Sequence, residues 1–191
     1  MSLPEPTLLT PEAYLDIERK SEIRSEYIAG RMFAMSGASE RHALIAINLQ
    51  GEIWSQMKGR PCKVYPSDMR VKVSPTGMYT YPDVAALCGK AEFEDGHIDT
   101  LLNPTVIIEV LSDSTELYDR GKKFAHYRRI DSLREYVLVS QNEMRIEHYR
   151  REEDRWIYSE VSGPDTVLHL ESIDCHVAVG AIYERVEFDP L

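Results

Sequence analysis

The chain has 191 residues, of which 43% are apolar and 28% charged, a composition that suits one soluble domain with a substantial core. Its net charge of −10 argues against a protein that coats nucleic acid nonspecifically, because such proteins carry broad basic surfaces. The sequence has no apolar run near the roughly 18 residues of a membrane span and no signal-peptide pattern at its start. We therefore expect a single domain over residues 1–191, cytoplasmic and without a membrane partner.

The cysteines are three in number, far apart, and in no CxxC pair. Cys62, Cys88 and Cys175 thus lack the spacing of a zinc site and the even count of a disulfide framework. We expect all three to be reduced thiols, which agrees with a cytoplasmic protein.

Helix signals flank two short strand patterns in the first third of the chain. Thr10 is a helix N-cap residue with Pro11 at the first helical position, and Ser39 can cap a longer apolar-periodic segment. Gly30 marks a turn between two β-branched or aromatic runs. The expected elements are helices over 11–19 and 39–57 and strands over 21–29 and 31–35.

The middle of the chain predicts strands around one crossover helix. The run Val106–Ile108 is apolar without alternation, which is typical of a central strand covered on both faces. Expected strands are 62–65, 69–73, 82–87, 104–111 and 135–140, with a polar loop over 89–103. A helix over 115–130, with Leu117 and Phe124 facing the sheet, makes a βαβ unit with the last two strands.

Alternating segments follow. Residues 144–149 and 155–161 alternate apolar and polar side chains and predict a β-hairpin, and 166–170 is a further short strand. Together these elements predict an α/β fold with a mixed β-sheet flanked by helices and a C-terminal β-hairpin extension.

Two carboxylates lie in apolar strand patterns. Asp83 begins one strand and Glu109 is near the end of the next, where an unpaired buried charge would be unfavourable by several kcal/mol. If these strands pair antiparallel, the two side chains become neighbours about 5 Å apart and repel unless a proton or a metal lies between them. Mg²⁺ suits such a site, because it binds one or two carboxylates and keeps room for a phosphate.

A lysine follows on the predicted helix. Asp119, Lys123 and Tyr127 are four residues apart and share one stripe of that helix. The ammonium of Lys123 could then hold a nucleophilic water or a phosphoryl oxygen, and Tyr127 could orient the lysine or contact a phosphate. Residues 118–134 carry net charge +4, which is either a solvated helix face or a strip that faces phosphate.

An ordered set of motifs resembles a known family. The set consists of Pro82-Asp83, the run EVLSDST from Glu109, the run DRGKKF from Asp119 with Tyr127, the run LREYVLV from Leu133, and the N-terminal Glu26, Gly30, MSG from Met35 and His42. This order is similar to the Uma-two family of restriction endonucleases in the PD-(D/E)xK nuclease superfamily, and it covers roughly residues 10 to 160.

The resemblance implies a restriction-endonuclease-like core with a four-stranded mixed sheet and Mg²⁺, or Mn²⁺ as a substitute, held by Asp83 and Glu109. It also implies a metal-ligating or water-orienting role for Glu26. The superfamily lysine should stand two residues after Glu109, but Leu111 is there. Similar proteins supply it from the next helix, which indicates Lys123, with Lys122 as the alternative.

These residues support a leading hypothesis and two others. The leading one is a Mg²⁺-dependent endonuclease that hydrolyses DNA, with Asp83, Glu109, Lys123 and Glu26 as catalytic residues. The second is a nuclease fold that has lost catalysis and acts as a binding or assembly module, and the third is a hydrolase of another phosphate ester. Further substrate contacts are expected from Tyr127, His42 and Lys122. The resemblance also suggests a homodimer, with contacts from Trp54, Trp156 or the C-terminal hairpin.

Structural alternatives stand beside these roles. Asp83 could merely end a turn, Glu109 could form an ion pair with Lys123 or Arg128, and Lys123 could be an ordinary surface lysine. Glu26, His42 and Tyr127 could serve only polar contact or packing.

Overall fold

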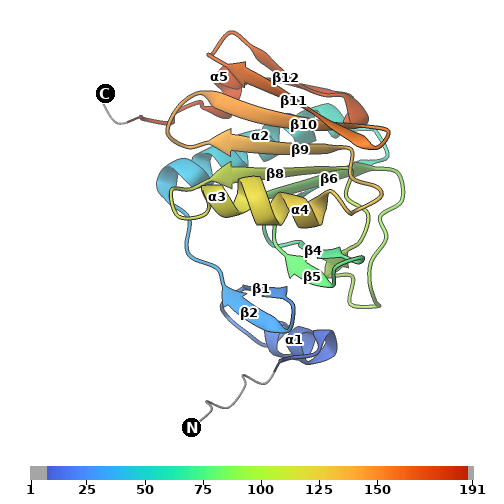
Figure 1. The fold of residues 1–191 in the computed structure, drawn as a ribbon. Coiled ribbons are helices and arrows are strands. Elements are labelled where there is room, and N and C mark those ends of the chain that lie inside the picture. The colour runs from blue at the N-terminus through green and yellow to red at the C-terminus, as the bar shows by residue number, and fades with distance from the viewer. Residues whose placement is uncertain (1–7, 189–191) are drawn as a thin grey trace.

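A computed structural model describes residues 8–188 and is built around a six-stranded mixed sheet. The strand order is β11-β10-β9-β8-β6-β3, in which only the β8–β9 pair is parallel. The expected α/β class with helices on both faces of a mixed sheet is confirmed (Figure 1). The strands are β3 (Cys62–Pro66), β6 (Val84–Cys88), β8 (Val106–Leu111), β9 (Glu135–Ser140), β10 (Arg145–Glu152) and β11 (Arg155–Ser162).

Strands β8 and β9 form the centre of this sheet, as the unbroken apolar runs predict. Every residue of both strands is buried, because helices cover the two faces. On one face lies α2 (Glu40–Met57), whose Ile45, Leu49 and Ile53 pack against the sheet. Ser39 caps this helix, its side chain accepting a hydrogen bond from the His42 N–H.

The crossover between β8 and β9 covers the other face but is not one regular helix. It consists of α3 (Glu116–Tyr118), a π-helical turn at Asp119–Lys123, and α4 (Phe124–Tyr127). A π turn holds one residue more than an α-helical turn. Compared with an uninterrupted α-helix of the same sequence, the side chains before the turn are therefore rotated relative to those after it. Phe124 stacks on Tyr136 as expected, with ring centroids 4.9 Å apart. The prediction that Leu117 faces the sheet is wrong, since its side chain is 83% exposed.

A second sheet of five strands extends from this core, with order β2-β1-β5-β4-β7 (Figure 1). The predicted helix and strands of the N-terminal part are present. Strands β5 and β7 were not predicted, because three and two residues are too few to show a pattern. The elements are α1 (Pro11–Glu18), β1 (Ser25–Ile28), β2 (Arg31–Ala34), β4 (Arg70–Val73), β5 (Met78–Thr80) and β7 (Thr100–Leu101).

The C-terminal part contains two hairpins. The first is the expected one, β10–β11, which extends the central sheet beyond the four strands that the resemblance implied. The second pairs β12 (Val167–Leu170) with β13 (Cys175–Ala178) around a 3₁₀ turn at Glu171–Ile173, and α5 (Val179–Ile182) follows. The inward side chains of this hairpin join the core beneath α2.

The cysteines correct one expectation. Cys62 and Cys88 stand opposite each other in the β3–β6 register and form a disulfide, whereas Cys175 is free and buried. The register of two strands 26 residues apart creates this pair, and sequence spacing does not reveal it. The expectation of three reduced thiols is therefore wrong, and it no longer supports a cytoplasmic location.

Among residues 8–188, no helix has the length and apolar character needed to cross a bilayer.

Candidate functional site

The antiparallel pairing of β6 and β8 brings Asp83 and Glu109 side by side at one end of the central sheet. Val84, which follows Asp83, is paired with Ile108, which precedes Glu109. The Asp83 side chain contacts His42 of α2, whereas the Glu109 side chain contacts the crossover, so elements from both faces of the sheet reach the two carboxylates. Asp83 Oδ2 also accepts the Val110 backbone N–H at 2.7 Å, which fixes its carboxylate beside β8.

The Glu109 carboxylate is held from the crossover. Its side chain is buried, with the residue only 4% exposed. The Tyr127 hydroxyl donates to Oε1 at 2.8 Å, and Lys123 Nζ lies 2.9 Å from the same oxygen. Tyr127 and Lys123, predicted to share a stripe, thus reach one carboxylate together.

Lys123 is the centre of the cluster, and it is itself 6% exposed. Besides Glu109, its Nζ lies 3.2 Å from Glu26 Oε1 and 3.5 Å from Asp119 Oδ1. Burial alone would lower the pKa of Lys123, but the three carboxylates raise it well above the ordinary value. Lys123 is therefore a cation at neutral pH.

One ammonium does not balance the carboxylates around it. Burial raises the pKa of Glu109 to about 8, with Lys123 opposing the shift and Asp119 and Asp83 adding to it. Burial likewise raises the pKa of Asp119, against the lowering effect of Lys123. Excess negative charge in a buried cluster favours either a proton or an added cation.

Glu26 reaches the cluster from β1 in the second sheet. The Thr80 hydroxyl donates to its Oε1, and the Tyr118 hydroxyl donates to its Oε2 at 3.3 Å. Burial raises the pKa of Tyr118, and the neighbouring Glu26 adds to the shift, so this phenol stays protonated and remains a donor. Sequence reasoning missed Thr80 and Tyr118: Thr80 belongs to a strand that was not predicted, and Tyr118 gave no signal apart from its position beside Asp119.

His42 belongs to the first turn of α2 and contacts Asp83. Its Nε2 lies 2.9 Å from Asp83 Oδ1, so His42 and Val110 hold the two oxygens of this carboxylate. His42 is therefore linked to the Glu109 cluster through Asp83.

The two neighbouring lysines point differently. Lys123 is buried among the carboxylates, whereas Lys122 is exposed and lines the cavity above them. The π turn thus carries one lysine that points into the carboxylate cluster and one that does not.

A cavity of about 1040 Å³ opens over the cluster. Its lining combines two kinds of side chain. The charged ones are Glu26, Asp83, Glu109, Asp119, Lys122 and Lys123. The apolar ones, here called the apolar wall, are Phe33, Ala34 and Met35 from β2 and its extension and Ala43, Ala46 and Ile47 from α2. Phe33 is 50% exposed there.

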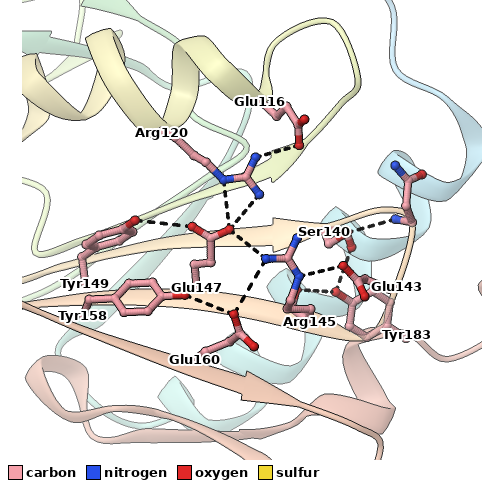
Figure 2. Close-up of polar contacts among 11 residues, drawn as sticks. Glu116, Arg120, Ser140, Glu143, Arg145, Glu147, Tyr149, Tyr158, Glu160 and Tyr183 are labelled. Atoms are coloured by element: carbon pink, nitrogen blue, oxygen red, sulfur yellow. Dashed lines mark hydrogen bonds and ion pairs between the residues drawn. The ribbon is translucent and has the colours of Figure 1, made fainter.

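Arg120 does not belong to a strip that faces phosphate. Its guanidinium donates to Glu147 Oε1 at 2.7 and 3.0 Å and to Glu116 Oε2 at 2.7 Å (Figure 2). Arg145 also donates to Glu147 Oε1, at 3.2 Å. These contacts fasten the π turn to β10, so Arg120 helps to position Lys123 instead of facing the cavity.

No group of three or more His, Cys, Asp or Glu side chains within residues 8–188 surrounds a ready-made metal position. The chemistry of the donors nevertheless fits a hard divalent cation. Asp83 and Glu109 offer carboxylate oxygens to one cavity, in a region with more negative than positive charge. Oxygen ligands of this kind are those that Mg²⁺ prefers.

A mixed sheet with a buried Glu–Lys cluster at the β6–β8 junction defines a restriction-endonuclease-like class of protein. The chain belongs to the Uma2 family, described as "Putative restriction endonuclease", and the match covers residues 11–179.

Relatives and a solved structure agree with this assignment. Two proteins of Synechocystis sp., slr1290 and sll1609, both described as uncharacterized, are each 35% identical to this chain. These matches cover 94% and 85% of this chain and 94% and 93% of the two relatives. A crystal structure from Anabaena variabilis, titled a putative nuclease belonging to DUF820, has a TM-score of 0.77, 18% identity, and coverage of 95% of this chain and 100% of its own. At this identity the likeness establishes the fold.

Proposed function

We propose that the protein is a Mg²⁺-dependent endonuclease that hydrolyses DNA phosphodiester bonds. The observation that carries the proposal is the contact of Lys123 Nζ with Glu109 Oε1 at 2.9 Å, with Asp83 and Glu109 both in the lining of one open cavity. A carboxylate pair and an ammonium in this arrangement match the components of a PD-(D/E)xK site, with the lysine supplied by the crossover. Membership of a family described as restriction endonucleases supports the same reaction.

Asp83 and Glu109 would hold the metal, with Mn²⁺ as a substitute for Mg²⁺, and Glu26 is the further carboxylate of the site. When bound, the ion supplies Lewis-acid stabilisation and lowers the pKa of a bound water. Asp83 is prepared for this role by His42 and the Val110 N–H, which fix both of its oxygens. Glu109 is prepared by Tyr127, which orients Oε1 through its hydroxyl.

Lys123 would stabilise negative charge that develops on the phosphoryl oxygens. Its ammonium is held by three carboxylates, so it needs little reorganisation during the reaction. Lys122 extends from the same turn into the cavity and would contact a phosphate of the bound strand. The apolar wall that contains Phe33 would face bases or sugars.

A metal titration followed by a cleavage assay tests the proposal. Mg²⁺ or Mn²⁺ should raise the melting temperature of the wild type by mass action, and the wild type should nick plasmid DNA. Asp83→Ala and Glu109→Ala should abolish both effects, and Lys123→Ala should abolish nicking. Asp154→Ala, which removes an exposed carboxylate in the β10–β11 turn, is the matched control and should keep both effects.

Nicking that persists in both Asp83→Ala and Glu109→Ala would contradict the assignment. Metal binding and DNA binding without cleavage of DNA or of other phosphodiesters would instead support a nuclease fold that acts as a binding or assembly module.

A further inference from the structure

Two histidines face each other on the solvent side of the C-terminal hairpin, away from the carboxylate cluster. His169 of β12 is paired directly with His176 of β13 in the antiparallel register. Outward and inward side chains alternate along both strands, and both histidines are on the exposed face. The two Nδ1 atoms are 2.9 Å apart, with the rings at 77° to each other.

Such an approach requires something to be shared between the two nitrogens. A neutral imidazole carries one N–H donor and one acceptor nitrogen, so two Nδ1 atoms that both act as acceptors repel each other. Either one ring carries its proton at Nδ1, or a cation binds both lone pairs. We infer that His169 and His176 form a bidentate site for a divalent transition-metal ion of the Cu²⁺ or Ni²⁺ type.

The distance between the nitrogens, which is also that of an N–H···N hydrogen bond, suits this class of metal. Metal–imidazole bonds of about 2.0–2.1 Å, with nitrogens 2.9 Å apart, subtend an angle of about 90° at the metal. That is the angle between adjacent ligands in square-planar or tetragonal geometry, which Cu²⁺ and Ni²⁺ adopt. A tetrahedral Zn²⁺ site would need the nitrogens about 3.3 Å apart. Imidazole nitrogen also distinguishes this site from the oxygen ligands of the carboxylate cluster.

The backbone around the pair is held in place, so the two rings are largely preorganised. Gln56, near the end of α2, accepts the His176 N–H at 2.9 Å and donates to the His176 carbonyl at 2.9 Å. Arg60 donates to the carbonyls of Ile173 and Asp174 in the connecting turn, at 2.6 and 3.0 Å. A rigid pair of ligands loses less conformational entropy on binding than two mobile ones.

The site is open toward solvent and distant from the cavity. The remaining positions on the metal are therefore available to water or to an external donor. Gln56 is 14 residues after His42 on α2, which corresponds to about 21 Å along the helix. Binding at the hairpin thus uses none of the residues proposed for phosphodiester hydrolysis.

Calorimetric titration of the untagged full-length protein with Cu²⁺ and with Ni²⁺ tests the inference. The wild type should bind one ion per chain at this site, and His169→Ala and His176→Ala should each weaken that binding at least tenfold. His97→Ala, which removes an exposed histidine from another loop, is the matched control and should bind as the wild type does. Circular dichroism checks that the exposed substitutions leave the fold intact.

A second variant separates this site from the carboxylate cluster. Asp83→Ala with Glu109→Ala should leave Cu²⁺ and Ni²⁺ binding unchanged, whatever happens to Mg²⁺ binding. Equal affinities of the wild type and both histidine variants would overturn the inference and mean that the rings share only a proton. Loss of binding in the carboxylate variant would overturn it as well, because the ion would then occupy the other site.

Discussion

At the scale of single residues, the most consequential feature is the difference between Lys122 and Lys123. Both were candidates from the sequence, and their chemistry is identical. Only Lys123 lies within reach of Glu26, Glu109 and Asp119. The two lysines therefore differ in their contribution to stability as well as in their role in the proposed reaction.

Replacing Lys123 with Met should destabilise the fold by about 3–5 kcal/mol, because the change leaves buried carboxylates without their cation. Lys122→Met should change the unfolding free energy by less than about 0.5 kcal/mol, since that side chain is exposed. Urea denaturation of both variants at pH 8 without metal measures the difference. Equal stability of the two variants would show that Lys123 is not needed to balance the cluster.

Sequence reasoning at this scale found the ionisable groups and Tyr127 but not the neutral partners of Glu26. Asp83 and Glu109 were conspicuous because a carboxylate in a β-branched run requires a reason. Thr80 and Tyr118 contact Glu26 through hydroxyls. A hydroxyl is compatible with almost any environment, so its presence in the sequence signals nothing.

At the scale of elements, long strands and capped helices were predictable and short or irregular ones were not. The runs around β8 and β9 and the cap at Ser39 gave clear patterns. Strand β7 has two residues and pairs with β4, so only tertiary contacts define it. The π turn depends on contacts such as the Arg120–Glu147 pair, which join residues far apart in the chain.

Glu135 of β9 joins the central sheet to the Glu171–Ile173 turn by accepting hydrogen bonds from Ser172. The strength of this contact should depend on pH. Burial raises the pKa of Glu135, but hydrogen bonds from Ser172 and the contact with His148 Nε2 at 2.6 Å outweigh burial and lower it below the usual value. The folded state therefore binds fewer protons at Glu135 than the unfolded state does. Its contribution to stability is present above about pH 4.5 and is lost as the pH falls through the lower folded value.

Glu135→Gln tests this dependence. The variant should be less stable than the wild type at pH 6, and the gap should close below about pH 4 as the wild-type carboxylate becomes protonated. Guanidinium unfolding between pH 3 and 7 measures the gap. A difference in unfolding free energy that does not change with pH would mean that packing, and not the charge of Glu135, stabilises the contact.

At the scale of the whole molecule, the Cys62–Cys88 disulfide joins β3, the edge strand of the central sheet, to β6. It closes a loop of 26 residues, and cross-links of this length stabilise a fold by about 3 kcal/mol through the unfolded state. Cys62→Ser with Cys88→Ser should lose about that much unfolding free energy.

Reductant should destabilise the wild type and have no further effect on the double variant. A thiol assay of unfolded, unreduced protein should detect only Cys175.

The proposed homodimer belongs to this scale too. Trp54 is 51% exposed on α2 and is available for a contact between copies, whereas Trp156 packs against Phe124 with ring centroids 5.2 Å apart. Trp54→Ser should convert a dimer to a monomer in light scattering and make the melting temperature independent of protein concentration. A wild type that is monomeric at every concentration would contradict this proposal.

The π turn at Asp119–Lys123, which is wider than an α-helical turn, also determines which substitutions and deletions this segment can accept. Gly121 lies within the turn, and a Cβ atom there would meet only open space, so alanine should fit at this position. Deleting Gly121 is different, because the turn would lose its extra residue and close to an ordinary helical turn. The distance between Asp119 and Lys123, which the wide turn sets, would then change. Related natural sequences should therefore vary at position 121 but keep the same number of residues between positions 119 and 123.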